Sequence, residues 1–272
     1  MNSVDFEYLK TMLKEQSAIV LETGKEYLVE SRLNPLAKSE GFVSLDALMA
    51  QMRAKPLGAL HHKVVDAMTT NETFFFRDIH PFEVLKKNVL PELIQKRANE
   101  KTLNIWCAAA SSGQEPYTIA MVIREYFPML NSWNIRFLAS DISDTMLQRC
   151  REGVYTQADV NRGLPAALLI KYFEKKEAHW KLKPEMIKMI EFKKINLMNP
   201  FPLMPPMDLV FMRNVLIYFD VETKKSILGR VRNILKKDGY FFLGGAETTL
   251  NLDENFERLA FDRASCYRLK VK

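Results

Sequence analysis

Cysteine, histidine and glycine are scarce in this chain, and each shortage excludes a kind of site. The three cysteines form an odd, widely spaced set without a CxxC pair, and the four histidines offer no pair with metal-ligand spacing. We therefore expect neither a disulfide framework nor a bound metal. No two glycines have the G-x-G spacing, so the GxGxxG dinucleotide fingerprint is also missing.

Long apolar runs are missing as well. No run reaches the length that spans a membrane, and the start at Met1 lacks a basic segment followed by an apolar one. We therefore expect a cytoplasmic protein without membrane insertion. Apolar residues make up 47% of the 272 residues, which is enough for one large domain and one small one.

Charge of one sign is only mildly in excess. With 39 basic and 33 acidic residues the net charge is +6, which suits an acidic protein partner, nucleic acid or neither. Lysines crowd one stretch, where a solvated face is the simplest interpretation. They are Lys171, Lys175, Lys176, Lys181, Lys183, Lys188, Lys193 and Lys194.

The first 70 residues have helical periodicity. Phe6, Leu9 and Leu13 fall at helix spacing, and Ser44 precedes another apolar stripe as a candidate N-cap. The pattern predicts a small bundle of about four helices. Pro35 lies inside the expected second helix, where we expect it to break or kink the helix.

The rest of the chain alternates short apolar runs with helical stretches. A linker over 71–100 contains a helix from His80 to about Asn99, with Pro81 in its first turn. Over 101–272 the apolar runs predict a parallel sheet covered on both faces. The runs are Leu103–Trp106, Ile135–Leu138, Asp208–Met212 and Tyr240–Leu243.

An insertion at about 154–192 interrupts this alternation. Its first part, Leu164–Phe173, has a helical pattern. Trp180 and Leu182 then alternate with lysines, and a second apolar run, Met186–Ile190, follows Pro184. We expect these two runs to form a small antiparallel appendage.

Two candidate binding segments follow the first two predicted strands. Residues 108–117, A-A-A-S-S-G-Q-E-P-Y, place small residues before a helix start, which lets backbone N–H groups approach an anionic ligand. A ligand-free turn between strand and helix fits this segment equally well. Asp141 ends the next strand, where an acidic residue accepts ribose hydroxyls in nucleotide-binding folds. Alternatively, Asp141 or Ser143 caps the following helix.

Two more segments contain polar residues that are candidates for ligand binding. Arg213 and Asn214 interrupt an apolar run at the carboxyl end of a predicted strand, where ligands bind in open α/β sheets, although a polar turn explains them too. Asp220 is a candidate cap for the next helix. If residues 71–78 are extended, Asn71, Thr73 and Arg77 point to one face and enter one cleft.

Together these segments resemble the chemotaxis receptor glutamate methyltransferases, the CheR family, over nearly the whole chain. The resemblance rests on five motifs in order. They are N-E-T-F-F-F-R-D at 71–78, A-A-A-S-S-G-Q-E-P-Y at 108–117, A-S-D-I-S at 139–143, N-L at 196–197 and F-M-R-N-V-L-I-Y-F-D at 211–220.

The resemblance implies an α/β fold class. A small all-helical domain at 1–70 and the linker at 71–100 would precede a Rossmann-like S-adenosylmethionine-dependent methyltransferase domain at 101–272, with a small antiparallel β-subdomain inserted. It also implies that nine residues surround S-adenosylmethionine, with Glu115 at its amino acid end and Asp141 at its ribose. These residues are Asn71, Thr73, Arg77, Glu115, Asp141, Asn196, Leu197, Arg213 and Asn214.

The implied reaction forms methyl esters on glutamate side chains in the cytoplasmic methylation helices of chemoreceptors. A glutamate with a pKa of about 4.3 is already a carboxylate at neutral pH, so its attack on the methyl group needs no general base. This agrees with the shortage of histidine and cysteine. We expect Arg77 and Tyr218 to be the catalytic side chains near the transferred methyl group.

Two departures from the family pattern concern receptor docking. Some relatives bind a peptide at the receptor's C-terminus through a glycine-containing loop, whereas residues 173–180 here contain no glycine. We therefore expect no pentapeptide tether. Relatives also use a basic second helix, whereas Lys25, Arg32 and Lys38 are here diluted by acidic residues.

Two other functions remain as alternatives. A catalytically silent module could sense the methyl donor or its product S-adenosylhomocysteine through the same fold. A nucleic-acid methyltransferase is disfavoured, because the Asn/Asp-Pro-Pro-Tyr/Phe signature of amino-directed enzymes is missing and Met204–Met207 does not supply it. We expect no nucleic-acid partner.

Overall fold

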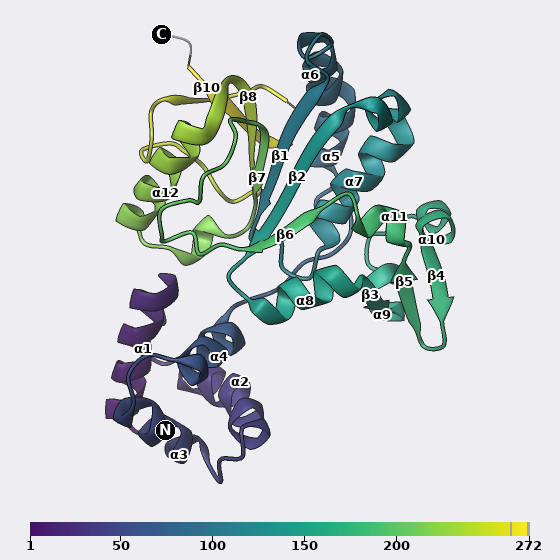
Figure 1. Cartoon of the computed structure of the whole chain (residues 1–272). Helices are drawn as coiled ribbons and strands as arrows, with labels where there is room; N and C mark the ends of the chain where they lie inside the picture. The colour runs from purple at the N-terminus through teal and green to yellow at the C-terminus, as the bar shows by residue number, and fades with distance from the viewer. Residues whose placement is uncertain (262, 271–272) are drawn as a thin grey trace. The chain divides into compact units, whose positions relative to one another are not determined.

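The computed structural model describes residues 1–261 and 263–270 and divides the chain into two compact units (Figure 1). The first unit comprises Met1–Thr70 with Tyr218–Thr223, and the second comprises Asn71–Ile217 with the chain from Lys224 onward. The finer division into domain, linker and insertion stays a prediction. No helix in the described ranges is long and apolar enough to cross a membrane.

The first unit is built on four helices, as the periodicity predicts: α1 (Ser3–Ser17), α2 (Glu26–Ser39), α3 (Leu45–Ala54) and α4 (Ala59–Met68). Ser44 caps α3, since its hydroxyl accepts the N–H of Ala47 at 3.1 Å. Arg32 of α2 donates to the main-chain oxygens of Met68 at 2.6 Å and Thr69 at 3.2 Å, which satisfies carbonyls at the end of α4. Arg32 therefore has an internal role in this unit.

The expected break at Pro35 is wrong, because α2 runs without interruption from Glu26 to Ser39. A proline in a helix leaves the carbonyl four residues earlier without its N–H partner. Pro35 and Ser31 both lie on the exposed side of α2, so water can solvate that carbonyl. The buried side carries Val29 and Leu33, which hold the helix against the bundle.

The second unit contains a seven-stranded sheet in the order β6-β2-β1-β7-β8-β10-β9. The four predicted apolar runs are all strands. The strands are β1 (Thr102–Ala108), β2 (Asn134–Asp141), β6 (Glu191–Lys194), β7 (Met207–Met212), β8 (Leu235–Leu243), β9 (Phe256–Arg258) and β10 (Ser265–Leu269).

The predicted parallel sheet is confirmed for the strands from β6 to β8 but does not extend to the edge that contains β10 and β9. The strands from β6 to β8 pair in parallel, whereas β10 pairs antiparallel with both β8 and β9. Parallel neighbours need a crossover connection, usually a helix, but the described residues between β8 and β10 form no helix. The chain therefore turns back on itself at this edge.

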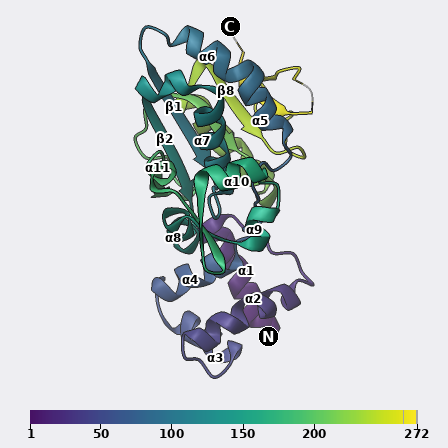
Figure 2. The same cartoon turned by 90° about the vertical axis from the view of Figure 1, so that its right-hand side faces the viewer.

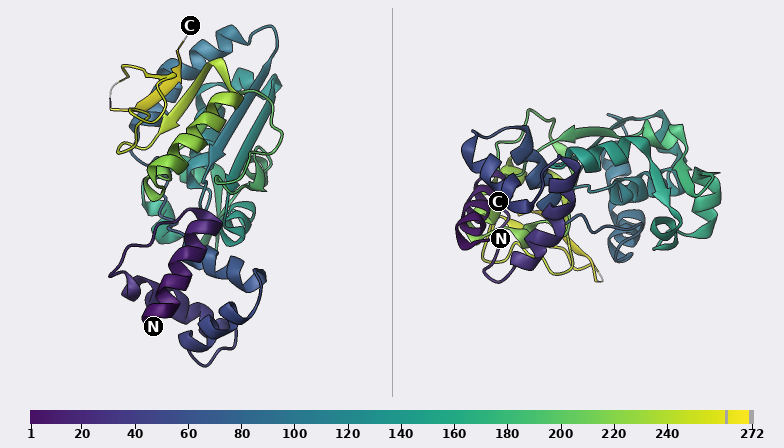
Figure 3. Two further views of the ribbon diagram at one scale, coloured as in Figure 1. Left: turned by 90° about the vertical axis from the view of Figure 1, so that its left-hand side faces the viewer. Right: turned by 90° about the horizontal axis from the view of Figure 1, so that it is seen from below.

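Helices cover both faces of the sheet. Figure 2 shows α7 (Gln114–Tyr126) with α5 (His80–Val84) and α6 (Leu90–Lys96) in front of the sheet, and Figure 3 shows α12 (Val221–Ile234) on the opposite face. A π-helical turn, Leu85–Val89, joins α5 to α6, and the N–H of Leu90 donates to the oxygen of Leu85. Pro91 directly follows Leu90 and, having no N–H, cannot donate a hydrogen bond to the preceding turn. The helical run predicted to about Asn99 ends at Lys96.

The insertion contains α9 (Gln157–Asn161), α10 (Ala166–Tyr172), α11 (Pro184–Ile187) and a second sheet. This sheet orders β3 (Val154–Thr156), β5 (His179–Leu182) and β4 (Phe173–Lys176) antiparallel. An antiparallel subdomain is thus confirmed, but the second apolar run is not one of its strands. Pro184 begins α11 instead, because proline suits the first turn of a helix.

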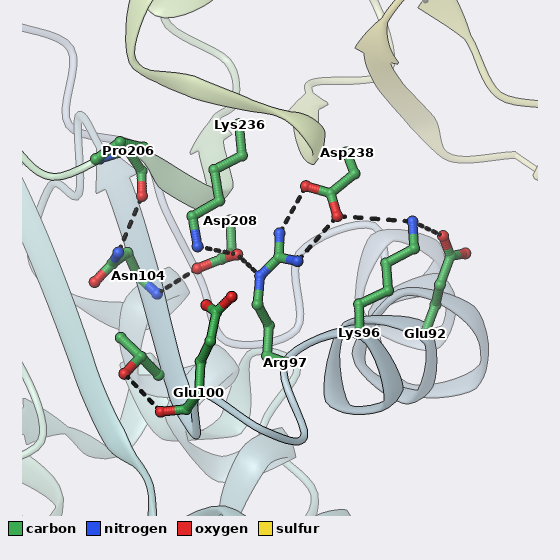
Figure 4. A network of polar contacts seen from close by, with 10 residues as sticks. Glu92, Lys96, Arg97, Glu100, Asn104, Pro206, Asp208, Lys236 and Asp238 are labelled. Atoms are coloured by element: carbon green, nitrogen blue, oxygen red, sulfur yellow. Dashed lines mark hydrogen bonds and ion pairs between the residues drawn. The ribbon is translucent and has the colours of Figure 1, made fainter.

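A buried polar network ties together the amino ends of the central strands (Figure 4). Asp208, at the start of β7, accepts from the N–H of Asn104 at 2.8 Å and pairs with Nε of Arg97 at 2.8 Å and Nζ of Lys236 at 2.9 Å. Arg97 also pairs with Asp238 at 2.6 Å. Asp208 is fully buried, so these partners offset the cost of removing its charge from water.

Candidate functional site

The candidate segments meet at the carboxyl edge of the parallel strands, opposite the network of Asp208. Strand register shows this directly, since Ala108 of β1 pairs with Ser140 of β2, and Met212 of β7 pairs with Leu243 of β8. Cys107 of β1 also pairs with Phe211 of β7. The loops that leave these strands therefore lie along one edge, where open α/β sheets bind their ligands.

The turn after β1 adopts left-handed backbone at three places with only one glycine. The φ angles are 53° at Ala109, 48° at Ser111 and 96° at Gly113. Each non-glycine residue in this region costs about 1 kcal/mol, which other contacts must offset. A Cβ on Gly113 would lie 3.0 Å from the Tyr155 hydroxyl, so this position also has little space.

Asp141 connects the turns that follow β1 and β2. Its Oδ2 accepts the N–H of Ser111 at 2.8 Å, and its Oδ1 accepts the N–H of Ser143 at 2.9 Å. The cap of α8 (Asp144–Glu152) is Ser143, whose hydroxyl accepts the N–H of Met146 at 3.0 Å. Capping thus belongs to Ser143. A carboxylate oxygen has a second lone pair, which suits Asp141 for a ribose hydroxyl as well.

Arg213 and Glu115 form a buried ion pair at the centre of this edge. Nη1 of Arg213 donates to Oε1 of Glu115, and Nη2 donates to the Asp78 carboxylate at 2.7 Å and the Arg77 carbonyl at 3.1 Å. Within the described part of the chain, Nε of Arg213 has no hydrogen-bond partner. Burial, followed by the nearby Glu115 carboxylate, raises the pKa of the Cys107 thiol.

The charges in this cluster fit a cationic ligand. Asp78, Glu115 and Asp141 supply three carboxylates near the edge, whereas Arg213 neutralises only part of their charge. S-adenosylmethionine carries an ammonium and a sulfonium against one carboxylate, so a site of net negative charge suits it. Asp78 was not among the predicted site residues, although it directly follows Arg77 in the first motif.

Residues 71–78 reach this edge, but they are not extended throughout, so the condition for placing Asn71, Thr73 and Arg77 on one face is not met. Phe76 and Asp78 adopt φ angles of 54° and 67°, so the chain turns before Arg77. The N–H of Phe76 donates to the Thr118 hydroxyl of α7 at 3.1 Å, which fixes this turn. Strand-like alternation therefore does not place Asn71, Thr73 and Arg77 on one face.

The predicted residues of this segment keep close links to the neighbouring turns. The carbonyl of Asn71 accepts the Ser111 hydroxyl at 2.8 Å. Nη1 of Arg77 donates to the carbonyl of Glu72 at 2.6 Å, and Thr73 is partly buried. Roles for these side chains toward a ligand stay predictions.

The insertion packs against the same segment. The Phe75 ring lies 5.1 Å from the ring of Tyr155 and 5.8 Å from that of Phe173, edge to face. Arg162 pairs with Glu72 at 2.7 Å, and this hydrogen bond lowers the pKa of the Glu72 carboxyl. A Cβ on Gly163 would lie 2.0 Å from the carbonyl oxygen of Phe75, so only glycine fits there.

Asn196 and Leu197 lie directly after β6, beside Asp141. The N–H of Ile195 donates to the Asp141 carbonyl at 3.0 Å, and the Asn196 side chain accepts the N–H of Met198 at 3.0 Å. The Leu197 carbonyl accepts Nη2 of Arg230 at 2.7 Å. Arg230, which was not among the predicted site residues, therefore anchors this loop from α12.

Asn214 and Tyr218 follow Arg213 after β7. Asn214 has a φ of 59°, and its N–H donates to Oε2 of Glu247 at 2.7 Å. Glu247 had no signal in the sequence beyond following two glycines after the last apolar run. Tyr218 ends the 3-10 turn η3 (Leu216–Tyr218) and belongs to the first compact unit, so its catalytic role stays a prediction.

Comparisons with known proteins match both units. Residues 4–69 match the family described as "CheR methyltransferase, all-alpha domain", and residues 71–264 match "CheR methyltransferase, SAM binding domain". The chain is 41% identical over 273 aligned positions to chemotaxis protein methyltransferase Cher2 of Pseudomonas putida and also to chemotaxis protein methyltransferase 1 of Pseudomonas aeruginosa. Each alignment covers 98% of both chains.

Solved structures give more distant matches. The glycopeptide N-methyltransferase MtfA complexed with S-adenosylmethionine aligns with a TM-score of 0.37 and 12% identity. That alignment covers 64% of this chain and 51% of MtfA.

Proposed function

Since the chain belongs to the CheR family of S-adenosylmethionine-binding methyltransferases, we propose that it methylates glutamate side chains of chemotaxis receptors to give methyl esters. The family matches confirm the predicted fold class and methyl donor. The observation that carries the proposal is the joining of Asp141, Glu115 and Arg213 at one sheet edge in a chain similar over its length to chemotaxis protein methyltransferases.

The donor site that we propose consists of the nine predicted residues. Asp141 would accept the ribose hydroxyls, and Glu115 would face the ammonium group of the amino acid end. Arg213 would hold the Glu115 carboxylate in place rather than contact the reacting atoms, because its side chain is buried in the ion pair. The remaining members would line the donor: Asn71, Thr73, Arg77, Asn196, Leu197 and Asn214.

The protein's contribution to the reaction is positioning. S-adenosylmethionine supplies an electrophilic methyl group on a sulfonium, and a receptor glutamate supplies a carboxylate that is ionised at neutral pH. No proton needs to be removed from the nucleophile, so alignment of the two groups and electrostatic support account for the rate. Arg77 would orient the incoming carboxylate, and Tyr218 would lie near the transferred methyl group.

The partner that we propose is the methylation helix region of a chemoreceptor, which places the reaction in the cytoplasm. We also propose that no pentapeptide tether is needed. The turn from β4 to β5 contains Glu177 and Ala178, and Glu177 takes a φ of 52° without being glycine. Calorimetry with a receptor C-terminal pentapeptide should therefore detect no tight binding, and tight binding would refute this part.

Methyl transfer to membranes tests the proposed reaction. The purified protein is incubated with methyl-labelled S-adenosylmethionine and membranes that contain a single chemoreceptor, with receptor-free membranes as control. We expect label that alkali releases as methanol, because esters hydrolyse and N-methyl groups do not. Donor binding without any transfer would instead support a silent sensing module.

A further inference from the structure

Glu247 is buried in the loop after β8, and its carboxylate accepts hydrogen bonds from three backbone N–H groups. Its Oε2 accepts from Asn214 and from Gly244, both at 2.7 Å, and its Oε1 accepts from Ile217 at 3.3 Å. A carboxylate that accepts several N–H groups out of water holds their segments firmly, because each group would otherwise lose its partner. Glu247 therefore connects the loop after β8 with the loop after β7.

The loop after β7 needs such support. Asn214 lies at a φ of 59°, in the left-handed region that asparagine tolerates better than most residues but still at some cost. Its position directly after Arg213 makes it part of the proposed donor site. The bonds from Glu247 to Asn214 and Ile217 hold this loop at both ends.

Gly244, in the loop after β8, lies close to both Asn214 and Glu247. A Cβ at this position would lie 2.6 Å from Nδ2 of Asn214, 2.8 Å from Oε2 of Glu247 and 2.9 Å from the Asn214 main-chain nitrogen. Two of these atoms belong to a backbone or a hydrogen-bonded carboxylate, so they cannot move freely. The Asn214 side chain thus packs against position 244, where only glycine leaves enough space for it.

We infer that Glu247 is a positioning residue for methyl-donor binding, acting by fixing the backbone of Asn214. The inference rests on the proposed donor site, in which Asn214 contacts S-adenosylmethionine. Glu247 itself need not touch the donor. A carboxylate placed only for fold stability would change unfolding without changing donor affinity.

The test compares S-adenosylmethionine affinity by calorimetry with thermal stability for Glu247→Ala, which removes the bonds to Asn214, Gly244 and Ile217. We expect an affinity about tenfold lower and a KM for the donor raised more than kcat is lowered. Glu247→Gln keeps one acceptor oxygen for Asn214 and Gly244 and loses only the bond to Ile217, so it should retain more of the affinity than Glu247→Ala.

Asp208→Asn is the matched control, because Asp208 is also a buried carboxylate that accepts a backbone N–H, at the opposite end of the strands. It should lower stability and leave donor affinity unchanged. Gly244→Ala would bring a Cβ within 2.6 Å of Nδ2 of Asn214 and 2.8 Å of Oε2 of Glu247, so it disturbs the same contact from the other loop. It should also weaken donor binding, which keeps the inference testable should Glu247→Ala fail to fold.

Asn214→Ala distinguishes the proposed donor contact of Asn214 from the positioning role of Glu247. Weak donor binding by Asn214→Ala together with wild-type affinity in Glu247→Ala would overturn the role of Glu247 and leave the proposed site standing. Wild-type affinity in Asn214→Ala would overturn the site at Asn214 and the inference with it. Weak binding in both variants, with unchanged affinity in Asp208→Asn, is the result we expect.

Discussion

Arg213, directly after β7, and Glu115, in the first turn of α7, form a buried ion pair across 98 positions of sequence. The same guanidinium bonds the Asp78 carboxylate and the Arg77 carbonyl, so three chain segments meet at one side chain. Removing one partner of such a pair leaves an uncompensated buried charge. Arg213 therefore holds Glu115, Asp78 and the main chain of Arg77 together in the candidate site.

Arg213→Ala should lower the free energy of unfolding by about 3–5 kcal/mol, the usual cost of breaking a buried pair. Urea unfolding followed by circular dichroism measures this. Arg268→Ala is the control, because Arg268 pairs with Glu257 where both side chains are about 40% exposed, at 43% and 39%. Such a pair contributes about 1 kcal/mol or less. Equal losses in the two variants would contradict the structural role of Arg213.

Asp141→Asn should weaken S-adenosylmethionine binding by about tenfold or more, because the amide replaces one acceptor oxygen by a donor. Ser143→Ala is the control. It removes the cap of α8 and should cost about 1 kcal/mol of stability while leaving donor affinity unchanged. Calorimetric titration of both variants separates ligand contact from helix capping. Unchanged affinity in Asp141→Asn would remove Asp141 from the donor site.

Gly163→Ala should destabilise the second unit by about 2 kcal/mol or more, since the residue has a φ of 83° and its Cβ would overlap the Phe75 carbonyl. Gly153→Ala is the matched control. Its φ is 60°, but the atom nearest to its added Cβ is the end of the Ile187 side chain at 2.9 Å, which can move. A smaller loss in Gly153→Ala isolates the overlap with Phe75. Equal losses would mean that backbone strain alone acts at both glycines.

Acid should weaken the Arg97–Asp238 pair. The hydrogen bond from Arg97 is the main cause that lowers the pKa of the Asp238 carboxyl in the folded state. Its contribution to stability is therefore present above the ordinary aspartate pKa of about 3.9 and is lost as pH falls through the lower folded value. The difference in unfolding free energy between the wild type and Asp238→Asn should shrink between about pH 6 and pH 3. A difference that stays constant over this range would contradict the assignment.

Much of the fold follows from local pattern. Apolar runs mark the central strands, and short polar side chains mark helix starts, since Ser44 and Asp220 cap α3 and α12 as expected. The uninterrupted α2 could not be predicted, because the cost of Pro35 depends on whether its side of the helix faces water. The antiparallel pairing of β10 with β8 and β9 was not predicted, because the direction of β10 depends on a connection without a helix.

Local sequence pattern also predicted part of the candidate site. Asp141, Glu115 and Arg213 stand in recognisable motifs, and the structure brings them to one sheet edge. Asp78 stands in the first motif, but its ion pair with Arg213 could not be predicted, and Glu247 lies outside the five motifs. Both roles depend on partners far away in sequence. Glu247 lies 33 positions from Asn214, and only the folded chain shows that its carboxylate holds that loop.

Glutamate methylation is tested directly by methyl transfer to one receptor whose candidate glutamates are replaced singly by glutamine. Tryptic peptides are analysed by mass spectrometry after incubation with the protein and S-adenosylmethionine. We expect one added methyl group on specific glutamates, lost at each position where glutamine replaces the acceptor and reduced with the Asp141→Asn protein. Donor binding without a methylated glutamate, or methylation on nitrogen instead, would contradict it.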